Sequence, residues 1–284
     1  MSHKILVTGA SGNVGREVVK ELRRLKQAVA AAAFNEADAA HIPAVGAETV
    51  LFDFGNPATY PQAFAGVSKL FLMRPPAIVD VEQYLFPVID YAQANGIKQI
   101  AFLSLLGVNR RTPHYRVEKY LKECGAPYTF IRPGFYMQNL DTTYRDDIRL
   151  RDELYIPAGR GKTSFVDVRD IGAVTARALT EEGQIGKIYE ITGPEALDYY
   201  RVAEILSGVL GRPITYRKPS PQAFEQRLRE RGVPEDFVKV QGMLYWPIRW
   251  RLGGKVTQEV SRLLGRPPIA MQEYVHDYAG KWRR

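Results

Sequence analysis

Residues 4–16 read Lys-Ile-Leu-Val-Thr-Gly-Ala-Ser-Gly-Asn-Val-Gly-Arg. The apolar run Lys4–Val7 is typical of a strand, and the three glycines that follow it predict a turn. Beyond the turn the spacing becomes helical, with apolar residues at Val14, Val18, Leu22 and Leu25. The chain therefore opens with a strand, a glycine-rich turn and a helix, in that order.

The start of this predicted helix can bind an anion. Its first backbone N–H groups have no partner inside the helix, and the helix dipole adds about half a positive charge there. Gly9 permits the tight turn, Gly12 lets a diphosphate approach the backbone, and Gly15 lets helix and strand pack closely. We therefore predict a dinucleotide site, the alternative being a turn with a purely structural role. The residues predicted to contact the cofactor here are Thr8, Gly9, Ser11, Gly12, Asn13, Val14 and Gly15.

The composition argues against several classes of protein. No apolar run approaches the roughly 20 residues of a membrane span, and the N-terminus has no signal-peptide pattern, so we expect a cytoplasmic protein. The single cysteine, Cys124, permits neither an intramolecular disulfide nor a cysteine zinc site. No spacing of His, Asp or Glu predicts another metal site. The net charge of +8 suits an anionic ligand, but the basic residues are dispersed, which argues against nucleic-acid binding.

Strand and helix patterns alternate through the first half of the chain. Further strands are predicted at 28–33, 48–54, 68–73, 98–103 and 128–132, and helices at 81–95 and 113–124. Such alternation predicts an α/β fold with a Rossmann-type, doubly wound parallel sheet.

The alternation weakens after residue 134. Short strands at 164–166 and 187–191 flank a predicted helix, and residues 199–284 are mainly helical with one strand at 214–217. We predict an NAD(P)-binding core of residues 1–134, to which residues 164–193 return. Residues 135–163 and 194–284 would form a smaller, substrate-binding lobe. Trp246 and Trp250, four residues apart, are predicted to lie in the core of that lobe.

Further cofactor contacts are expected where the other strands end. The second strand is followed by Phe34 and Asn35, and the third ends at Asp53 and Phe54. Asp53 either accepts a hydrogen bond from the adenine amino group or is a turn residue. Met73 and Arg74 end the fourth strand, at the sheet edge where open α/β sheets bind ligands. Since residues 34–38 contain no Arg, and the acids there come late, the choice between NAD and NADP stays open.

Several longer motifs follow one another in a recognisable order. They are the segments 8–15, 53–54, 114–125, 128–139, 164–171 and 189–197, which include Tyr-Thr-Phe-Ile-Arg-Pro-Gly-Phe-Tyr-Met-Gln-Asn at 128–139. Together they resemble the NmrA-like group of atypical short-chain dehydrogenase/reductases, which includes triphenylmethane reductase, quinone reductases and NAD(P)-sensing regulators. The resemblance implies a bound NAD(P) whose nicotinamide lies near the end of the fifth strand. Phe34 departs from the Arg that many members carry for the NADP phosphate.

Two arrangements of catalytic residues are compatible with the sequence. Ser104 ends the fifth strand, and Tyr115 and Lys119 share one helix face, which would let the lysine lower the phenol pKa for proton donation. Alternatively, His114 and Glu118 face the cofactor, which is the usual register in the NmrA-like group. The two pairs point about 100° apart on the helix, so they cannot face the nicotinamide equally.

The sequence favours an enzyme that reduces a small molecule. Phe135, Tyr136 and Asn139 follow the sixth strand and can line a site for a flat, apolar substrate, or pack between sheet and lobe. We expect NAD(P)H-dependent reduction of a quinone-like or carbonyl compound. The main alternative is a non-catalytic NAD(P) redox sensor that docks a protein partner, and a third is an epimerase or isomerase.

Overall fold

The computed structural model describes residues 3–42 and 45–284. The chain divides into two compact units. Unit 1 comprises Met1–Pro133, Val168–Ile191 and Arg262–Gly265, and unit 2 comprises Gly134–Asp167, Thr192–Ser261 and Arg266–Arg284. Residues 1–2 and 43–44 of the predicted nucleotide-binding core lie outside the described residues.

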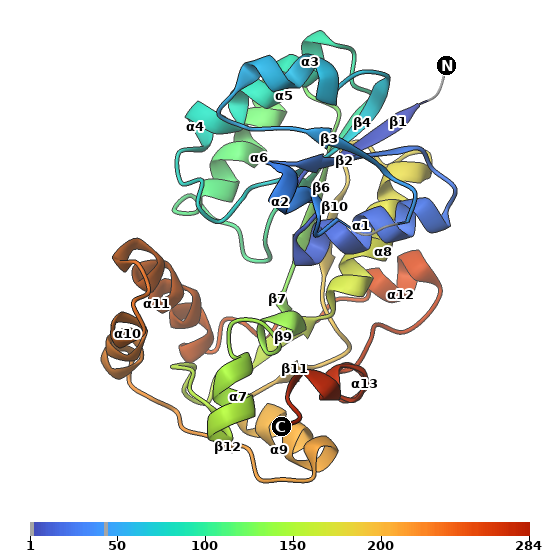
Figure 1. The fold of residues 1–284 in the computed structure, drawn as a ribbon. Helices are drawn as coiled ribbons and strands as arrows, with labels where there is room; N and C mark the ends of the chain where they lie inside the picture. Colours follow the sequence, from blue (N-terminus) through green and yellow to red (C-terminus); the bar gives the residue numbers. More distant parts are fainter. Residues whose placement is uncertain (1–2, 43–44) are drawn as a thin grey trace. The chain divides into compact units, whose positions relative to one another are not determined.

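Unit 1 contains a parallel sheet in the order β10-β6-β5-β4-β1-β2-β3 (Figure 1). Its strands are β1 (Lys4–Val7), β2 (Val29–Ala33), β3 (Glu48–Leu51), β4 (Val67–Met73), β5 (Gln99–Leu103), β6 (Tyr128–Pro133) and β10 (Ile188–Ile191). All the neighbouring pairs run parallel. The predicted doubly wound sheet is confirmed.

Helices cover both faces of this sheet (Figure 1). They are α1 (Asn13–Arg24), α2 (Glu36–Ala39), α3 (Tyr60–Ala63), α4 (Val81–Tyr84), α5 (Phe86–Ala94), α6 (Pro113–Glu123) and α8 (Val168–Thr180), with a 3-10 turn η1 (Pro57–Thr59). Helices α3 to α6 bury apolar side chains against one face, where Leu70 and Phe102 point. Lys69 and Gln99, whose side chains alternate with these, donate to the carbonyls of Leu179 and Ala178 in α8 on the other face.

The segment 81–95 forms two helices instead of the single predicted one. Helix α4 ends at Tyr84 and α5 begins at Phe86, with Leu85 between them. Pro87 lies in the first turn of α5 and has no N–H to continue the hydrogen bonding of α4. The proline therefore starts a new helix at the point where the old one stops.

Unit 2 has small sheets and several helices. Its elements are β7 (Phe135–Tyr136), η2 (Met137–Asn139), α7 (Arg145–Arg151), β8 (Glu153–Leu154), β9 (Thr163–Val166), β11 (Ala196–Leu197), α9 (Tyr199–Leu210), β12 (Thr215–Tyr216), α10 (Pro221–Glu230), α11 (Glu235–Arg249), α13 (Met271–Tyr278) and η3 (Ala279–Lys281). Helix α12 (Glu259–Leu264) contributes residues to both units. Strand β9 pairs with β7 and β11, so the segment that returns to unit 1 starts at Val168, not at residue 164.

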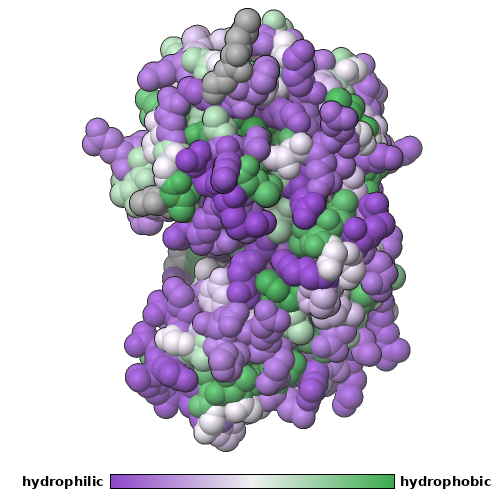
Figure 2. Space-filling model, turned by 90° about the vertical axis from the view of Figure 1, so that its right-hand side faces the viewer, coloured by the Kyte–Doolittle hydropathy of each residue, from purple (hydrophilic) through white to green (hydrophobic). Residues whose placement is uncertain are grey.

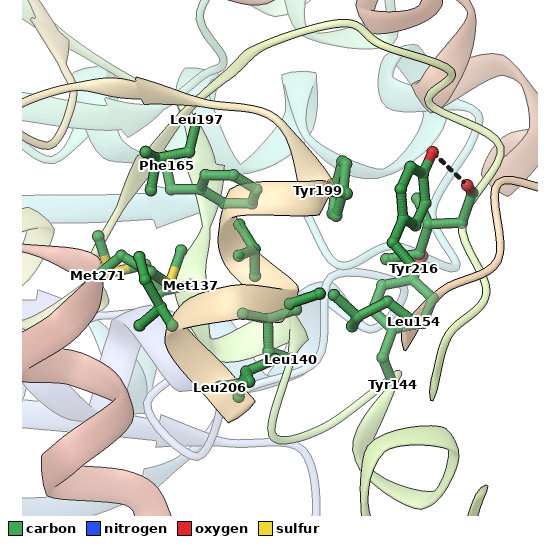
Figure 3. Packing of buried hydrophobic residues seen from close by; sticks show 14 of the residues in the cluster. Met137, Leu140, Tyr144, Leu154, Phe165, Leu197, Tyr199, Leu206, Tyr216 and Met271 are labelled. Atoms are coloured by element: carbon green, nitrogen blue, oxygen red, sulfur yellow. Dashed lines mark hydrogen bonds between the residues drawn. The ribbon is translucent and has the colours of Figure 1, made fainter. Parts of the chain in front are cut away.

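The core of unit 2 is rich in large side chains (Figure 3). Met137, Phe165, Leu206 and Met271 are among its buried members. The hydroxyl of Tyr216 donates to the carbonyl of Ile156 at 2.9 Å, which keeps a buried phenol hydrogen-bonded.

Two tryptophans of α11 lie outside this core. Trp246 and Trp250 are 60% and 64% exposed, so the prediction that they are core residues is wrong. Their spacing places both on one side of the helix, but nothing within the described residues covers that side. Hydrophilic residues predominate on the face shown in Figure 2. No helix among the described residues has the length and apolarity needed to cross a membrane.

Candidate active site

The strand order reverses between β1 and β4, and the glycine-rich turn lies there. Open α/β sheets bind ligands outside the carboxyl ends of the strands at such a reversal. Thr8, which is fully buried, joins the two strands: its hydroxyl donates to the carbonyl of Phe71 at 3.0 Å and accepts the N–H of Met73 at 2.9 Å. The Thr8 side chain is therefore used within the sheet, and so is its N–H, which donates to the carbonyl of Phe71 at 3.0 Å.

The three glycines of the turn are required for different reasons. Gly9 has φ of +64°, and a Cβ there would lie 2.5 Å from Cε of Met73. A Cβ on Gly15 would lie 2.0 Å from the carbonyl oxygen of Gly9, so α1 could not approach the turn. A Cβ on Gly12 would meet, among the described atoms, only that same oxygen, at 3.3 Å. That contact with a backbone oxygen is tight, but no described side chain lies within 4 Å of the Cβ position, so the site above Gly12 is clear of side chains.

This turn fits the diphosphate of a dinucleotide. Gly12 is the N-cap of α1, no side chain of the described residues caps the helix, and its first turn contains no acidic residue. The N–H groups of Asn13, Val14 and Gly15 precede the first hydrogen bond of the helix, in which the N–H of Arg16 donates to the carbonyl of Gly12 at 3.0 Å. The half-buried Ser11 and the exposed Asn13 lie beside Gly12. Cofactor contact by these residues stays a prediction.

The tip of β2 lies beside the glycine-rich turn. Val7 of β1 pairs with Ala31 of β2, so β2 reaches the level of the turn at its last residues. Phe34 is 60% exposed, and its N–H donates to Oδ2 of Asp38 at 2.9 Å. Asn35 caps α2 by accepting the N–H of Asp38 at 2.8 Å.

The end of β3 lies next to this tip, because the N–H of Phe52 donates to the carbonyl of Ala33 at 2.9 Å. Oδ1 of Asp53 accepts the N–H of Gly55 at 2.8 Å, which makes Asp53 a turn residue. Its second oxygen is still suitable for an adenine amino group. The ring of Phe54 packs edge-on against Phe52.

Arg74, which follows β4, and His114 each have a buried nitrogen without a hydrogen-bond partner among the described residues. The Nη1 of Arg74 donates to the carbonyls of Pro75, Pro76 and Ile78, which holds the loop after β4. The Nε of Arg74 and the Nδ1 of His114 are buried, and neither has a hydrogen-bond partner in the described part of the chain. Burial and the positive charge of Arg74 lower the pKa of His114 to about 3, so its imidazole is neutral at working pH. It can donate or accept a hydrogen bond there but does not serve as a cation.

Ser104 belongs to a buried ionic network. Its hydroxyl donates to Oε1 of Glu118 at 2.6 Å, and both side chains are nearly inaccessible. Arg132 on β6 binds both oxygens of the same carboxylate, through Nε at 2.8 Å and through Nη2. Glu190 on β10 lies 3.9 Å from Nη1 of Arg132. The hydrogen bond to Glu118 raises the pKa of Arg132. This network ties α6 to the ends of three strands.

The structure does not assemble Ser104, Tyr115 and Lys119. No hydrogen bond joins them within the described residues, and Lys119 is exposed, with Nζ 3.5 Å from Glu123. Helix α6 instead presents Glu118 inwards, with Val117 and Leu121. His114, one turn earlier, shares that side of the helix. The geometry therefore favours the His114/Glu118 register.

The three predicted substrate residues belong to unit 2. Phe135 is half-buried, with its ring 5.9 Å from Phe165 and 5.7 Å from Tyr245. Burial raises the pKa of Tyr136, so its phenol stays protonated at neutral pH. Asn139 ends the 3-10 turn η2 and is half-buried.

Two residues with a clear structural role, Asp38 and Arg132, were not among the predicted site residues, and Glu118 was considered only as the partner of His114. Asp38 could have been included from its place after the second strand. Arg132 carried no local signal, because a single Arg in a strand does not reveal its partner. No group of residues that could hold a metal ion occurs in the described ranges.

The chain is similar in sequence and in fold to known proteins. The model of the NmrA-like family matches residues 1–244. An NAD(P)H azoreductase of Xenophilus azovorans is 34% identical over 97% of this chain and 98% of its own. The crystal structure of an NADPH-dependent quinone oxidoreductase of Escherichia coli, complexed with NADPH, has a TM-score of 0.85 at 28% identity, covering 97% and 99% of the two chains. The structure of Citrobacter sp. triphenylmethane reductase complexed with NADP(H) has a TM-score of 0.83 at 26% identity, over 96% and 99%.

Proposed function

Because the chain belongs to the NmrA-like family, we propose that it is an NAD(P)H-dependent oxidoreductase acting on a quinone-like or carbonyl compound. The observation that carries the proposal is the uncapped start of α1, clear of side chains above Gly12, at the reversal of strand order. The three relatives named above are reductases, which supports this function and does not favour a non-catalytic sensor.

The residues of unit 1 would bind and orient the cofactor. When bound, the reduced nicotinamide cofactor supplies a hydride, which a quinone takes up with one proton to become a hydroquinone. The N–H groups of Asn13, Val14 and Gly15 would hold the diphosphate, and Met73 would pack beside it over Gly9. Ser104 would act as a positioning residue, because its hydroxyl is already engaged by Glu118.

The residues of unit 2 would bind the acceptor. Phe135 offers an aromatic surface to a flat ring, and Asn139 offers amide hydrogen-bonding groups. Tyr136, whose phenol stays protonated, can donate a hydrogen bond to a quinone oxygen.

The test is oxidation of NADH and of NADPH by the purified protein with quinones, azo dyes and triphenylmethane dyes as acceptors. Gly12→Val places a side chain where the diphosphate would lie, so cofactor affinity and turnover should both fall by about tenfold or more. Gly208→Val is the matched control, because a Cβ on Gly208 in α9 meets no atom within 4 Å. No turnover with any acceptor, or a Gly12→Val protein with unchanged affinity, would contradict the proposal.

A further inference from the structure

The tip of β2 lies next to the strand that leads into the glycine-rich turn. From the pairing of Val7 with Ala31, Phe34 follows at the level of the glycine-rich turn, one strand away from it. Neighbouring strands lie about 4.8 Å apart, so the tip is within reach of the adenosine half of a dinucleotide held at α1. In this fold the residues after the second strand contact the ribose 2′ position.

The side chains at this tip suit a hydroxyl and not a phosphate. Phe34 is exposed and has no polar group to offer. Asp38 is held at the tip because its Oδ2 accepts the N–H of Phe34, and Asn35 accepts the N–H of Asp38 in turn. Residues 34–40 contain two acids, Glu36 and Asp38, and no Lys or Arg.

The end of β3, next to this tip, does not supply a positive charge for a 2′-phosphate either. Residues 52–59 read Phe-Asp-Phe-Gly-Asn-Pro-Ala-Thr, again with an acid and no base. The next residue with a basic side chain after Phe34 is His41, whose Nδ1 lies 2.8 Å from the carbonyl oxygen of Ala37. A 2′-phosphate carries about −1.5 to −2 charges at neutral pH and would meet the Asp38 carboxylate, and neither strand end supplies a Lys or Arg to offset the repulsion.

We infer that this protein selects NADH over NADPH, and that Phe34 and Asp38 are the residues that determine the choice. The inference rests on the proposed function. The carboxylate of Asp38 can accept a hydrogen bond from the ribose 2′-hydroxyl of NADH, while the same carboxylate excludes the 2′-phosphate. In this the chain would differ from the two relatives whose structures contain NADPH or NADP(H).

The test is a direct binding titration of the purified protein with NADH and with NADPH, by calorimetry, without an acceptor. We expect the dissociation constant for NADH to be lower by about tenfold or more. The double variant Phe34→Arg with Asp38→Asn supplies a cation and removes the carboxylate, so the preference should shift towards NADPH by about tenfold or more. Phe34→Arg alone, at an exposed position, should shift it in the same direction by less.

Ile185→Arg is the matched control. Ile185 is 58% exposed and precedes β10, which puts it at the amino edge of the parallel sheet, opposite the cofactor edge. Ile185→Arg adds the same charge as Phe34→Arg, so an effect of net charge alone would change NADPH binding in both variants. We expect the ratio of the NADH and NADPH affinities in Ile185→Arg to equal that of the unaltered protein.

The outcomes separate this inference from the proposed function. Equal affinities, or tighter NADPH binding through another cation such as Arg16, would overturn the inference and leave the reductase intact. A Phe34→Arg protein with an unchanged ratio would also overturn it. If neither cofactor binds the unaltered protein, the proposed function itself fails.

Discussion

His114 is a buried base that stays neutral in the folded protein. Burial lowers the pKa of its imidazole, and the positive charge of Arg74 lowers that pKa further. The structure thus explains why the residue that shares the inward side of α6 with Glu118 is not a proton-donating imidazolium. The two side chains have different roles: Glu118 is the salt-bridge partner of Arg132, and His114 is a neutral polar group.

The stability of the protein should therefore depend on the charge state of His114 below neutral pH. The pKa of His114 is about 3 in the folded protein and 6.5 in the unfolded chain, so between these values the unfolded chain binds more protons. As pH falls through this range, the free energy of unfolding should fall by about 1 kcal/mol per pH unit from this residue. His114→Gln removes that contribution.

Urea unfolding at about pH 7 and about pH 5 measures the effect. The unaltered protein should lose more stability between the two conditions than His114→Gln does. Equal losses in the two proteins would show that His114 is not buried as described.

Close packing of α1 and α8 is the main contact between helices in unit 1. Gly172 of α8 lies against Glu17 of α1, and a Cβ on Gly172 would lie 2.7 Å from Cβ of Glu17 and 2.8 Å from its carbonyl carbon. Because α1 also presents the amides that we propose to bind the diphosphate, its position on the sheet matters for the candidate site. A small residue at 172 lets both helices lie close to the sheet and to each other.

Gly172→Ala should therefore destabilise the protein although alanine favours helices. We expect a loss of about 1–3 kcal/mol from the forced separation of the helices. Gly208→Ala in α9 is the control: the same change in open space should raise stability by up to about 1 kcal/mol. Urea unfolding of the two variants should move in opposite directions, and a shift of the same sign in both would contradict this account.

At the scale of the whole molecule, each unit is built from segments that are distant in sequence. Unit 2 joins three such segments, the last of which is Arg266–Arg284. The C-terminal Trp282 is fully buried in its core, where Nε1 donates to the carbonyl of Leu140 at 3.1 Å. Its ring lies edge-on to Tyr274, 6.0 Å away. The end of the chain is thus a structural part of unit 2.

Loss of this tryptophan should be costly. Trp282→Ala should lower the free energy of unfolding by about 3–5 kcal/mol, since it leaves a large cavity and an unpaired carbonyl. Arg283→Ala, one residue further along on the exposed surface, should change it by less than about 0.5 kcal/mol. Denaturant unfolding followed by circular dichroism compares them; similar values for both would mean that the C-terminus is not docked.

The sequence by itself determined the doubly wound sheet, the glycine-rich turn and the helix behind it. These follow from short-range patterns: apolar runs of strand length, glycines at a turn and helical spacing after it. The sequence also showed that residues 34–38 contain no Arg, because these residues directly follow the predicted strand 28–33. The break at Leu85 was not predicted, although Pro87 is a local signal for it.

The tertiary structure alone decided which side of α6 faces inwards and which side chains meet there. Two faces of one helix carried plausible pairs, and only docking against β5 and β6 brought Glu118 to Ser104 and Arg132 and left Lys119 in solvent. In the same way, spacing placed Trp246 and Trp250 on one side of α11 but did not reveal that this side is uncovered. The physical reason is that periodicity defines a face, whereas burial and hydrogen-bond partners come from residues far away in sequence.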